Sequence, residues 1–153
     1  MSFHFNIVPE AVGFAEPGSK AEVIAQMAAL ISRVYALNSA ALEASLAERE
    51  ARGSTGFGRG VAIPHARFAG VKRPVAGFLK LAKPVDFGSA DGEPVNLVFG
   101  LVSPDQAGAT HLQALAAISR LIREERVHAA LCAARSEEEL FGLLTNVIDR
   151  DAA

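Results

Sequence analysis

Residues 95 to 102 read Val-Asn-Leu-Val-Phe-Gly-Leu-Val, an almost unbroken apolar run. A strand with one face in water alternates apolar and polar residues, whereas a strand covered on both faces does not. We therefore predict a central strand here, with helices on each side of it. Two shorter apolar runs, at 61–63 and 75–81, are rich in β-branched residues and bounded by Gly, Pro and Asp, so they predict further strands.

Helices are predicted on both sides of this block of strands. Each predicted start has a Ser, Thr or Asn ahead of apolar residues at helical spacing. Three of these starts also have a Glu or Gln three residues later, which completes a capping box. These starts are Ser19 with Glu22, Asn38 or Ser39, Thr110 with Gln113, and Ser136 with Glu139, with one more helix over 127–134. This order predicts an α/β fold with a mixed sheet sandwiched between helical layers. We expect a single domain over 1–153, with its core at about 8–148.

The composition restricts the classes of function. Fifteen basic and seventeen acidic residues give a net charge of −2, so no overall positive field draws the chain onto nucleic acid or anionic lipid. Cys132 is the only cysteine, which excludes an internal disulfide and removes the usual thiolates of a structural zinc site. The sequence has no signal-peptide pattern and no apolar run of about 18 residues. We expect a cytoplasmic protein without membrane insertion, whose partner is a small ligand or another protein.

The stretch that ends at His65 is the candidate site. Residues 54 to 65 read Ser-Thr-Gly-Phe-Gly-Arg-Gly-Val-Ala-Ile-Pro-His. Loop glycines let backbone N–H groups approach an anion such as phosphate. The residues expected to bind phosphate in this turn are Ser54, Thr55 and Gly56. Pro64 fixes its own φ and favours an extended residue before it, so the chain reaches His65 stiffly, which suits a nucleophile that must be aimed.

Two other residues favour chemistry on a phosphoryl group. His111 follows the predicted cap Thr110, in a first helical turn where free N–H groups and the helix dipole favour an anion and a neutral imidazole. Arg49 lies on the face of Leu42 and carries a guanidinium that matches phosphate oxygens. Together they predict phosphoryl transfer, with His65 as phosphoryl acceptor, Arg49 as phosphate clamp and His111 as stabiliser. Taken singly, each residue also fits an ordinary structural role, bonded to nearby backbone or paired at the surface.

Other kinds of site have weaker support. No Gly-Lys-Ser/Thr follows the glycines and the turn opens no helix, which disfavours nucleotide binding. Ser54 and Ser103 lie beside predicted strand ends, but no Gly-x-Ser-x-Gly of a serine hydrolase occurs. No acidic or cysteine residue lies at familiar metal spacing, so we expect neither a metal nor a cofactor. His4 and His128 are interpreted as structural or exposed.

The combination resembles a known family. The segments concerned are Arg49-Glu50, residues 53–58, Gly60 to His65, and Thr110-His111-Leu112. Together they resemble the enzyme IIA domain of the bacterial phosphoenolpyruvate-dependent sugar phosphotransferase system, in its fructose/mannitol class. The resemblance implies that His65 accepts phosphate from the histidine-containing phosphocarrier protein and that Arg49 and His111 support it. It also implies a mixed sheet of about five strands, and glycines that give a partner clearance around His65.

Two branches of this family share these residues. Sugar-transport components pass phosphate to a IIB domain, whereas nitrogen-type regulators control target proteins through their phosphorylation state. The segment Arg-Glu-x-x-Gly-Ser-Thr-Gly at 49–56 is closer to the nitrogen-type branch, so we favour a regulator over a transport component. A passive anion- or metal-binding module is a third interpretation. The main departure from the family pattern is the stretch 66–73, where Arg67, Lys72 and Arg73 add positive charge beside the histidine. This stretch leaves the identity of the partner protein undetermined.

Overall fold

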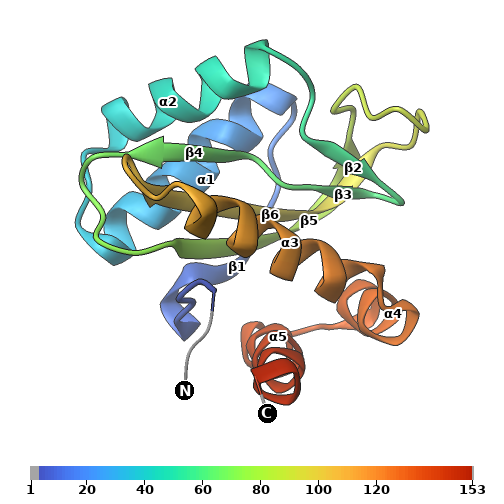
Figure 1. Ribbon diagram of the computed structural model, residues 1–153. Coiled ribbons are helices and arrows are strands. Elements are labelled where there is room, and N and C mark those ends of the chain that lie inside the picture. The colour runs from blue at the N-terminus through green and yellow to red at the C-terminus, as the bar shows by residue number, and fades with distance from the viewer. Residues whose placement is uncertain (1–3, 153) are drawn as a thin grey trace.

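A computed structural model describes residues 4–152, with side chains up to residue 145. Within this part of the chain, six strands form one mixed sheet, and five α-helices and a short 3-10 helix (η1) surround it (Figure 1). The helices are η1 Pro9–Ala11, α1 Lys20–Tyr35, α2 Ser39–Ala51, α3 Ala109–Arg123, α4 Glu125–Ala133 and α5 Glu137–Ala152. The strands are β1 Val12–Ala15, β2 Gly56–Gly58, β3 Val61–Ala62, β4 His65–Phe68, β5 Val75–Val85 and β6 Val95–Pro104. The expected domain, 1–153, extends beyond the described residues at both ends.

Strand β6 lies at the centre of the sheet, as predicted. The strand order is β1-β5-β6-β3-β2, and β4 also pairs with β6. β5 runs antiparallel to β6, while β3 and β4 run parallel to it. At the two ends of this order, β1 is parallel to β5 and β2 is antiparallel to β3. The sheet is therefore mixed, as expected.

The structure has six strands where about five were expected, because one extended segment, 61–68, forms two strands, β3 and β4, instead of one. Both pieces keep the same register on β6, with Val61 opposite Leu97 and His65 opposite Leu101. Between them stands Pro64, which has no N–H to donate. Its carbonyl still accepts from the Leu101 N–H at 3.0 Å. His65 thus begins a strand and is held against the centre of the sheet.

Helices cover both faces of the sheet, which confirms the prediction made from the apolar run. Leu97, Phe99 and Leu101 of β6 pack in one core cluster with residues of α3, α4 and α5. Val98 and Val102 point to the other face and pack with residues of α1 and α2. Since successive residues of a strand point to opposite faces, one apolar strand contributes to both cores.

Two glycines let α1 lie close to the sheet. Gly77 of β5 and Gly100 of β6 are directly opposite each other. A Cβ on Gly100 would lie 2.6 Å from Cγ and Sδ of Met27, and a Cβ on Gly77 would lie 3.0 Å from Cγ1 of Ile31. A side chain at Gly100 would require Met27 to move, and one at Gly77 would press against Ile31, both on the sheet-facing side of α1.

Most predicted helix starts are confirmed by their hydrogen bonds. The Ser19 hydroxyl accepts from the Glu22 N–H at 3.2 Å, and the Ser136 hydroxyl accepts from the Glu139 N–H at 3.1 Å. Asn38 caps α2 by accepting from the Ala41 N–H at 2.9 Å.

Two local predictions are wrong. Thr110 does not cap α3, because that helix already begins at Ala109 and its N-cap is Gly108, with φ at +55°. No helix or strand was predicted before Pro17, yet that segment contains η1 and the strand β1. Within the described part of the chain, no helix combines the length and the apolar character needed to cross a membrane.

Candidate active site

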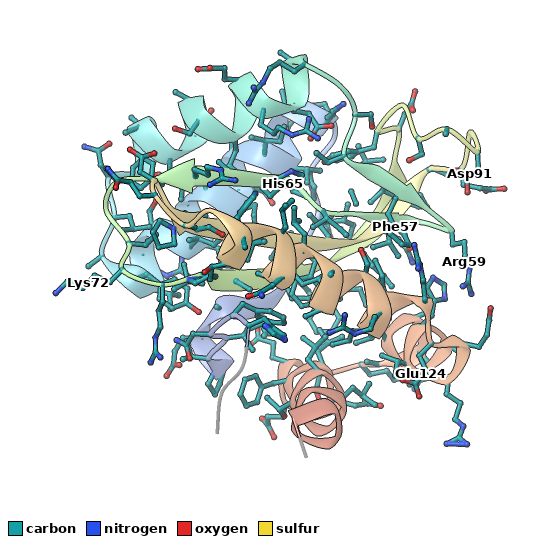
Figure 2. The ribbon with its side chains drawn as sticks, viewed as in Figure 1. Phe57, Arg59, His65, Lys72, Asp91 and Glu124 are labelled. Carbon is teal, nitrogen blue, oxygen red and sulfur yellow. The ribbon has the colours of Figure 1, made fainter. Side chains whose placement is uncertain are left out.

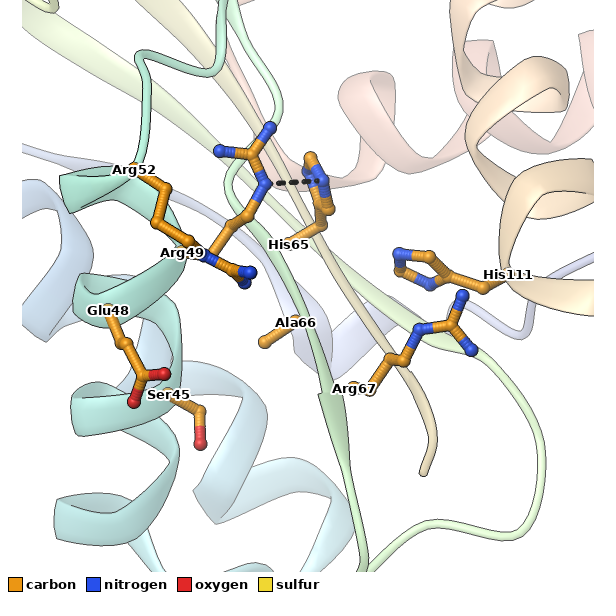
Figure 3. Close-up of a pocket in the computed structure, with 8 residues that line it drawn as sticks. All are labelled: Ser45, Glu48, Arg49, Arg52, His65, Ala66, Arg67 and His111. Carbon is orange, nitrogen blue, oxygen red and sulfur yellow. Dashed lines mark hydrogen bonds between the residues drawn. The ribbon is translucent and has the colours of Figure 1, made fainter. Parts of the chain in front are cut away.

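A pocket of about 290 Å³ lies where α2, β4 and the start of α3 meet (Figure 3). Its lining residues are Ser45, Glu48, Arg49, Arg52, His65, Ala66, Arg67 and His111. The three residues selected from the sequence, Arg49, His65 and His111, therefore lie around one cavity although the chain separates them by up to 62 positions (111 − 49).

The hydrogen bonds of His65 fix its tautomer. Nδ1 lies 2.7 Å from the carbonyl oxygen of Ile63, which can only accept, so Nδ1 carries the hydrogen. On the other side of the ring, the Nε–H of Arg49 donates to Nε2 at 3.2 Å. Nε2 therefore presents a lone pair toward the pocket, which is the arrangement of a nucleophile.

The surroundings of His65 keep it neutral. Burial lowers its pKa below the usual value, and the positive charge of Arg49 lowers it further, while the bond to Ile63 works in the opposite direction. Arg49 is itself anchored, because its Nη1 donates to the carbonyl oxygen of Gly53 at 2.9 Å. The guanidinium is thus fixed by the chain segment just beyond the end of its own helix.

His111 lies in the first turn of α3, and its ring centroid is 5.5 Å from that of His65. Its side chain is buried, and Nδ1 lies 2.6 Å from Oγ of Ser103 in β6. Burial, followed by the neighbouring His65, Arg67 and Arg49, lowers the pKa of His111 to about 4. Both imidazoles are therefore neutral at pH 7.

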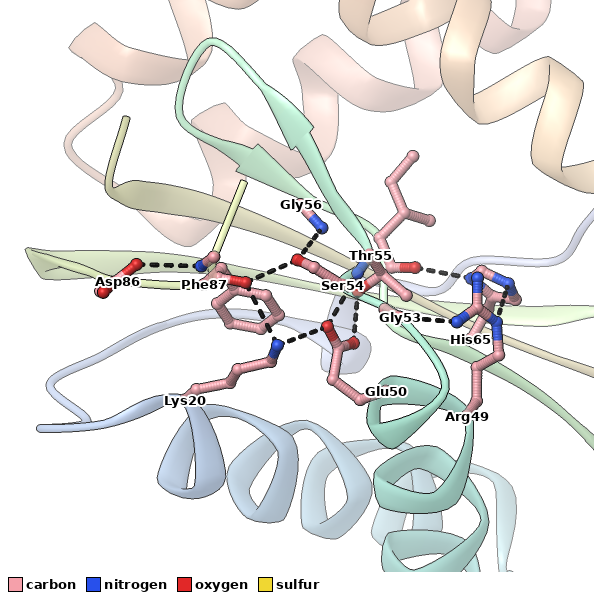
Figure 4. A network of polar contacts seen from close by, with 12 residues as sticks. Lys20, Arg49, Glu50, Gly53, Ser54, Thr55, Gly56, His65, Asp86 and Phe87 are labelled. Atoms are coloured by element: carbon pink, nitrogen blue, oxygen red, sulfur yellow. Dashed lines mark hydrogen bonds and ion pairs between the residues drawn. The ribbon is translucent and has the colours of Figure 1, made fainter. Parts of the chain in front are cut away.

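The turn at Ser54, Thr55 and Gly56 is bonded within the fold (Figure 4). Buried Glu50 accepts from the Thr55 N–H at 2.7 Å and from the Thr55 hydroxyl at 2.5 Å, and it pairs with Nζ of Lys20 at 2.8 Å. The Ser54 hydroxyl donates to the carbonyl of Phe87 and accepts from the Gly56 N–H. These residues are outside the pocket lining, and phosphate binding by them stays a prediction.

The same network supports His65 through the backbone. The carbonyl oxygen of Thr55 accepts from the Ile63 N–H at 3.0 Å, and the Ile63 carbonyl in turn holds Nδ1 of His65. Glu50 therefore fixes Thr55, which fixes the peptide that orients the His65 ring.

The glycines do not provide clearance around His65, so that expectation is wrong. A Cβ on Gly56 would lie 2.1 Å from Oγ of Ser89, and a Cβ on Gly60 would lie 2.8 Å from Oδ1 of Asn96. Gly58 and Gly60 also have positive φ, at +103° and +80°. They are required for the tight β2–β3 turn and its contact with residues 89–96.

A model of the family described as "Phosphoenolpyruvate-dependent sugar phosphotransferase system, EIIA 2" matches residues 9–147. The chain belongs to this family. A nitrogen regulatory protein of Bradyrhizobium diazoefficiens is 38% identical over 139 residues, which are 90% of this chain and 91% of that protein. The fructose-specific EIIABC component of Bacillus subtilis is 36% identical over 84% of this chain, which covers 20% of that longer protein.

A solved structure gives the same result at the level of the fold. The nitrogen regulatory protein IIA-Ntr of Neisseria meningitidis superposes with a TM-score of 0.83 and 34% identity, covering 90% of this chain and 95% of that one. The chain is thus an EIIA 2 phosphotransferase-system protein, and its relatives include both nitrogen regulatory proteins and a sugar-transport component.

Several residues of the pocket in this EIIA 2 protein were not identified from the sequence. Ser45 lies on α2 and Arg52 directly follows its last residue, at positions that no motif distinguishes. Arg67 was noted only as added charge, and it lies beside His111 in the pocket (Figure 3). Ser103 was considered only as a weak hydrolase candidate. It lies outside the pocket lining, near the end of the central strand and eight residues before His111, and no pattern in the sequence links the two residues.

The remaining described histidines lie elsewhere. His128 bonds through Nε2 to the carbonyl of Arg59 at 2.8 Å, and Figure 2 shows Arg59 at the edge of the molecule, apart from His65. Its Nδ1 is 4.0 Å from Sγ of Cys132. His4 is exposed. Among the described residues, no group of three His, Cys, Asp or Glu side chains has the arrangement of a metal site.

Proposed function

We propose that this EIIA 2 protein accepts a phosphoryl group on Nε2 of His65 from the phosphohistidine of a histidine-containing phosphocarrier protein. The observation that carries the proposal is the tautomer of His65, whose Nδ1–H is held by Ile63 and whose Nε2 lone pair faces the pocket. Membership of a phosphotransferase-system family supports the same chemistry. Such a carrier reaction takes place in the cytoplasm.

In the proposed step, the P–N bond of the donor histidine breaks as a P–N bond forms to Nε2 of His65. Before transfer, Arg49 donates its Nε–H to Nε2 of His65. When Nε2 bonds to phosphorus, this N–H must reorient and donate to a phosphoryl oxygen instead. His111, neutral and within the same pocket, donates to another phosphoryl oxygen. The proton on Nδ1 stays on His65, and its bond to Ile63 stabilises the positive charge that the ring acquires.

We further propose that the phosphorylation state regulates target proteins, as in the nitrogen-type branch. The similarity over nine-tenths of both chains to a nitrogen regulatory protein supports this choice. The alternative is a component of a fructose-type transporter that passes the phosphate to a IIB domain, which the similarity to the fructose-specific EIIABC component supports. The chemistry at His65 is the same in both.

Labelling tests the phosphoryl step. Phosphoenolpyruvate, enzyme I and the phosphocarrier protein are expected to add one acid-labile, base-stable phosphate to the wild type and none to His65→Ala. His128→Ala is the matched control, because that histidine lies outside the pocket and is expected to leave the label unchanged. Label retained in His65→Ala would refute the assignment.

Two further measurements separate the branches. A regulator is expected to bind its target with an affinity that differs between the phosphorylated and unmodified forms. A transport component is expected to lose its label to an added IIB domain within the mixing time. Transfer to IIB together with equal target affinity in both forms would establish the alternative.

A further inference from the structure

We infer that Ser103 is a positioning residue for His111: its hydroxyl donates to Nδ1 and thereby leaves the ring hydrogen of His111 on Nε2, the nitrogen that is free for the pocket. This inference deepens the proposed function and rests on it for its catalytic meaning. The hydrogen bond itself is a property of the unmodified protein and is tested independently.

The direction of this bond follows from the hydrogen-bonding groups that are present. Ser103 is fully buried in β6, and its Oγ lies 2.6 Å from Nδ1 of His111. Among the described residues, His111 is the only hydrogen-bond partner of this hydroxyl. If Nδ1–H donated to Oγ, the serine hydrogen would be buried without an acceptor, which is costly. If the serine donates, both groups are satisfied, because neutral imidazole has one acceptor nitrogen.

The neutral state of His111 is required for this bond, and the surroundings provide it. Burial and nearby positive charges lower the pKa of His111 to about 4, so Nδ1 holds a free lone pair at pH 7. A protonated ring would carry hydrogens on both nitrogens and could not accept from Ser103.

The two histidines of the pocket therefore hold opposite tautomers. A backbone carbonyl keeps the hydrogen of His65 on Nδ1 and frees Nε2 to attack, whereas a buried hydroxyl keeps the hydrogen of His111 on Nε2. The ring centroids are 5.5 Å apart, and both residues line the same cavity. One ring thus supplies a lone pair and the other an N–H for the oxygens of the transferred group. In other proteins too, a hydrogen bond to one ring nitrogen of a histidine fixes the tautomer and the orientation with which the other nitrogen acts.

The first test measures the tautomer directly. In the ¹⁵N-labelled wild type at pH 7, long-range ¹H–¹⁵N correlation spectra are expected to show His111 with a protonated Nε2 and an unprotonated Nδ1. His65 is expected to show the reverse, which provides an internal comparison in the same spectrum. A protonated Nδ1 on His111 would overturn the inference, and this result needs neither a variant nor a phosphate donor.

The second test asks whether Ser103 acts through His111. Phosphoramidate serves as a protein-free donor: its P–N bond breaks, a bond forms from phosphorus to Nε2 of His65, and ammonia leaves. We expect Ser103→Ala to speed the subsequent loss of the phosphoryl group by about threefold to tenfold, the value of one hydrogen bond. In a His111→Ala background the same change is expected to alter that rate less than twofold.

A matched control comes from Ser32, another buried serine whose hydroxyl has no partner within the described residues. Ser32→Ala in α1 is expected to leave the rate unchanged. An equal effect of Ser103→Ala in both backgrounds would overturn the positioning role, because the serine would then act without His111. Absence of any label in the wild type would instead refute the proposed function, while the tautomer spectrum would still decide the hydrogen bond.

Discussion

Single side chains set how this protein responds to pH, and buried His111 is the clearest case. Its pKa falls from 6.5 to about 4 on folding, so the unfolded chain binds this proton more readily than the folded protein. Stability from this residue is therefore complete above pH 6.5 and is lost as the pH falls toward 4. We expect a loss of about 2–3 kcal/mol in the free energy of unfolding over that interval.

Urea denaturation at pH 7, 5.5 and 4 would measure this loss. His111→Gln is the comparison, because it keeps a polar side chain and removes the titration. The difference in stability between wild type and variant is expected to shrink as the pH falls. A difference that stays constant across the range would contradict the assigned shift.

Glu50 is expected to matter for stability more than an acidic residue on a helix usually does. It is buried, accepts two hydrogen bonds from Thr55 and forms an ion pair with Lys20. Glu50→Gln replaces one acceptor oxygen with a donor and leaves part of this set unpaired, at a cost of about 2 kcal/mol. Exposed Glu43 on the same helix is the control, and Glu43→Gln is expected to change stability by less than about 0.5 kcal/mol. Equal denaturation midpoints for the two variants would show that the network is not stabilising.

At the level of helices and strands, the distance between α1 and the sheet depends on Gly77 and Gly100. A methyl group at Gly100 would meet Met27 at 2.6 Å, so Gly100→Ala is expected to destabilise the fold by about 1–3 kcal/mol through overpacking. Gly142 in α5 has open space around it, and Gly142→Ala is expected to stabilise the helix by about 0.5–1 kcal/mol. Thermal unfolding of both variants measures the two effects, which are expected to have opposite signs.

The helices and strands that could be predicted are those whose sequence patterns lie within the element itself. The capped helices and the central strand were predicted because their signals lie within the element itself. Strand β1 could not be predicted because four residues are too few to show alternation, and its pairing with β5 joins residues 66 positions apart, such as Val12 and Phe78. The pattern at Thr110 fits a helix cap, but Gly108 with its positive φ starts the helix earlier.

Some residues of the candidate site could be predicted from the sequence, and others could not. Arg49, His65 and His111 were selected by residue type and neighbouring sequence, and the fold brings them to one pocket. Arg52, Arg67 and Ser103 were not assigned to the site, because their positions depend on how α2, β4 and β6 pack together. A hydrogen bond between a strand and the following helix leaves no periodic trace in the sequence.

Considered as a whole, the protein is weakly acidic, yet the surroundings of its pocket are basic. Arg52 and Arg67 line the pocket, and within the described residues neither guanidinium forms an ion pair. Lys72 and Arg73 are exposed on the turn that follows β4, where Figure 2 shows Lys72 at the edge of the molecule. Like charges gathered around one cavity attract an anionic partner and increase its rate of association.

We therefore expect phosphoryl transfer from the phosphocarrier protein to slow by about tenfold or more between 20 mM and 500 mM salt. Arg67→Glu is expected to lower the transfer rate at low salt, whereas Lys83→Glu, an exposed change at the far end of β5, is expected to leave it unchanged. Stopped-flow or quenched labelling would measure both rates. A transfer rate independent of salt would show that the charges do not guide the donor.

Within the described residues, the strand that begins at His65 is paired on one side only. β4 pairs with β6, and α2 packs alongside β4 (Figure 1). An uncovered strand edge is a template onto which another chain can add by hydrogen bonding. Because α2 packs against β4, changes that loosen α2 are expected to expose this strand and to produce aggregates as well as an inactive pocket.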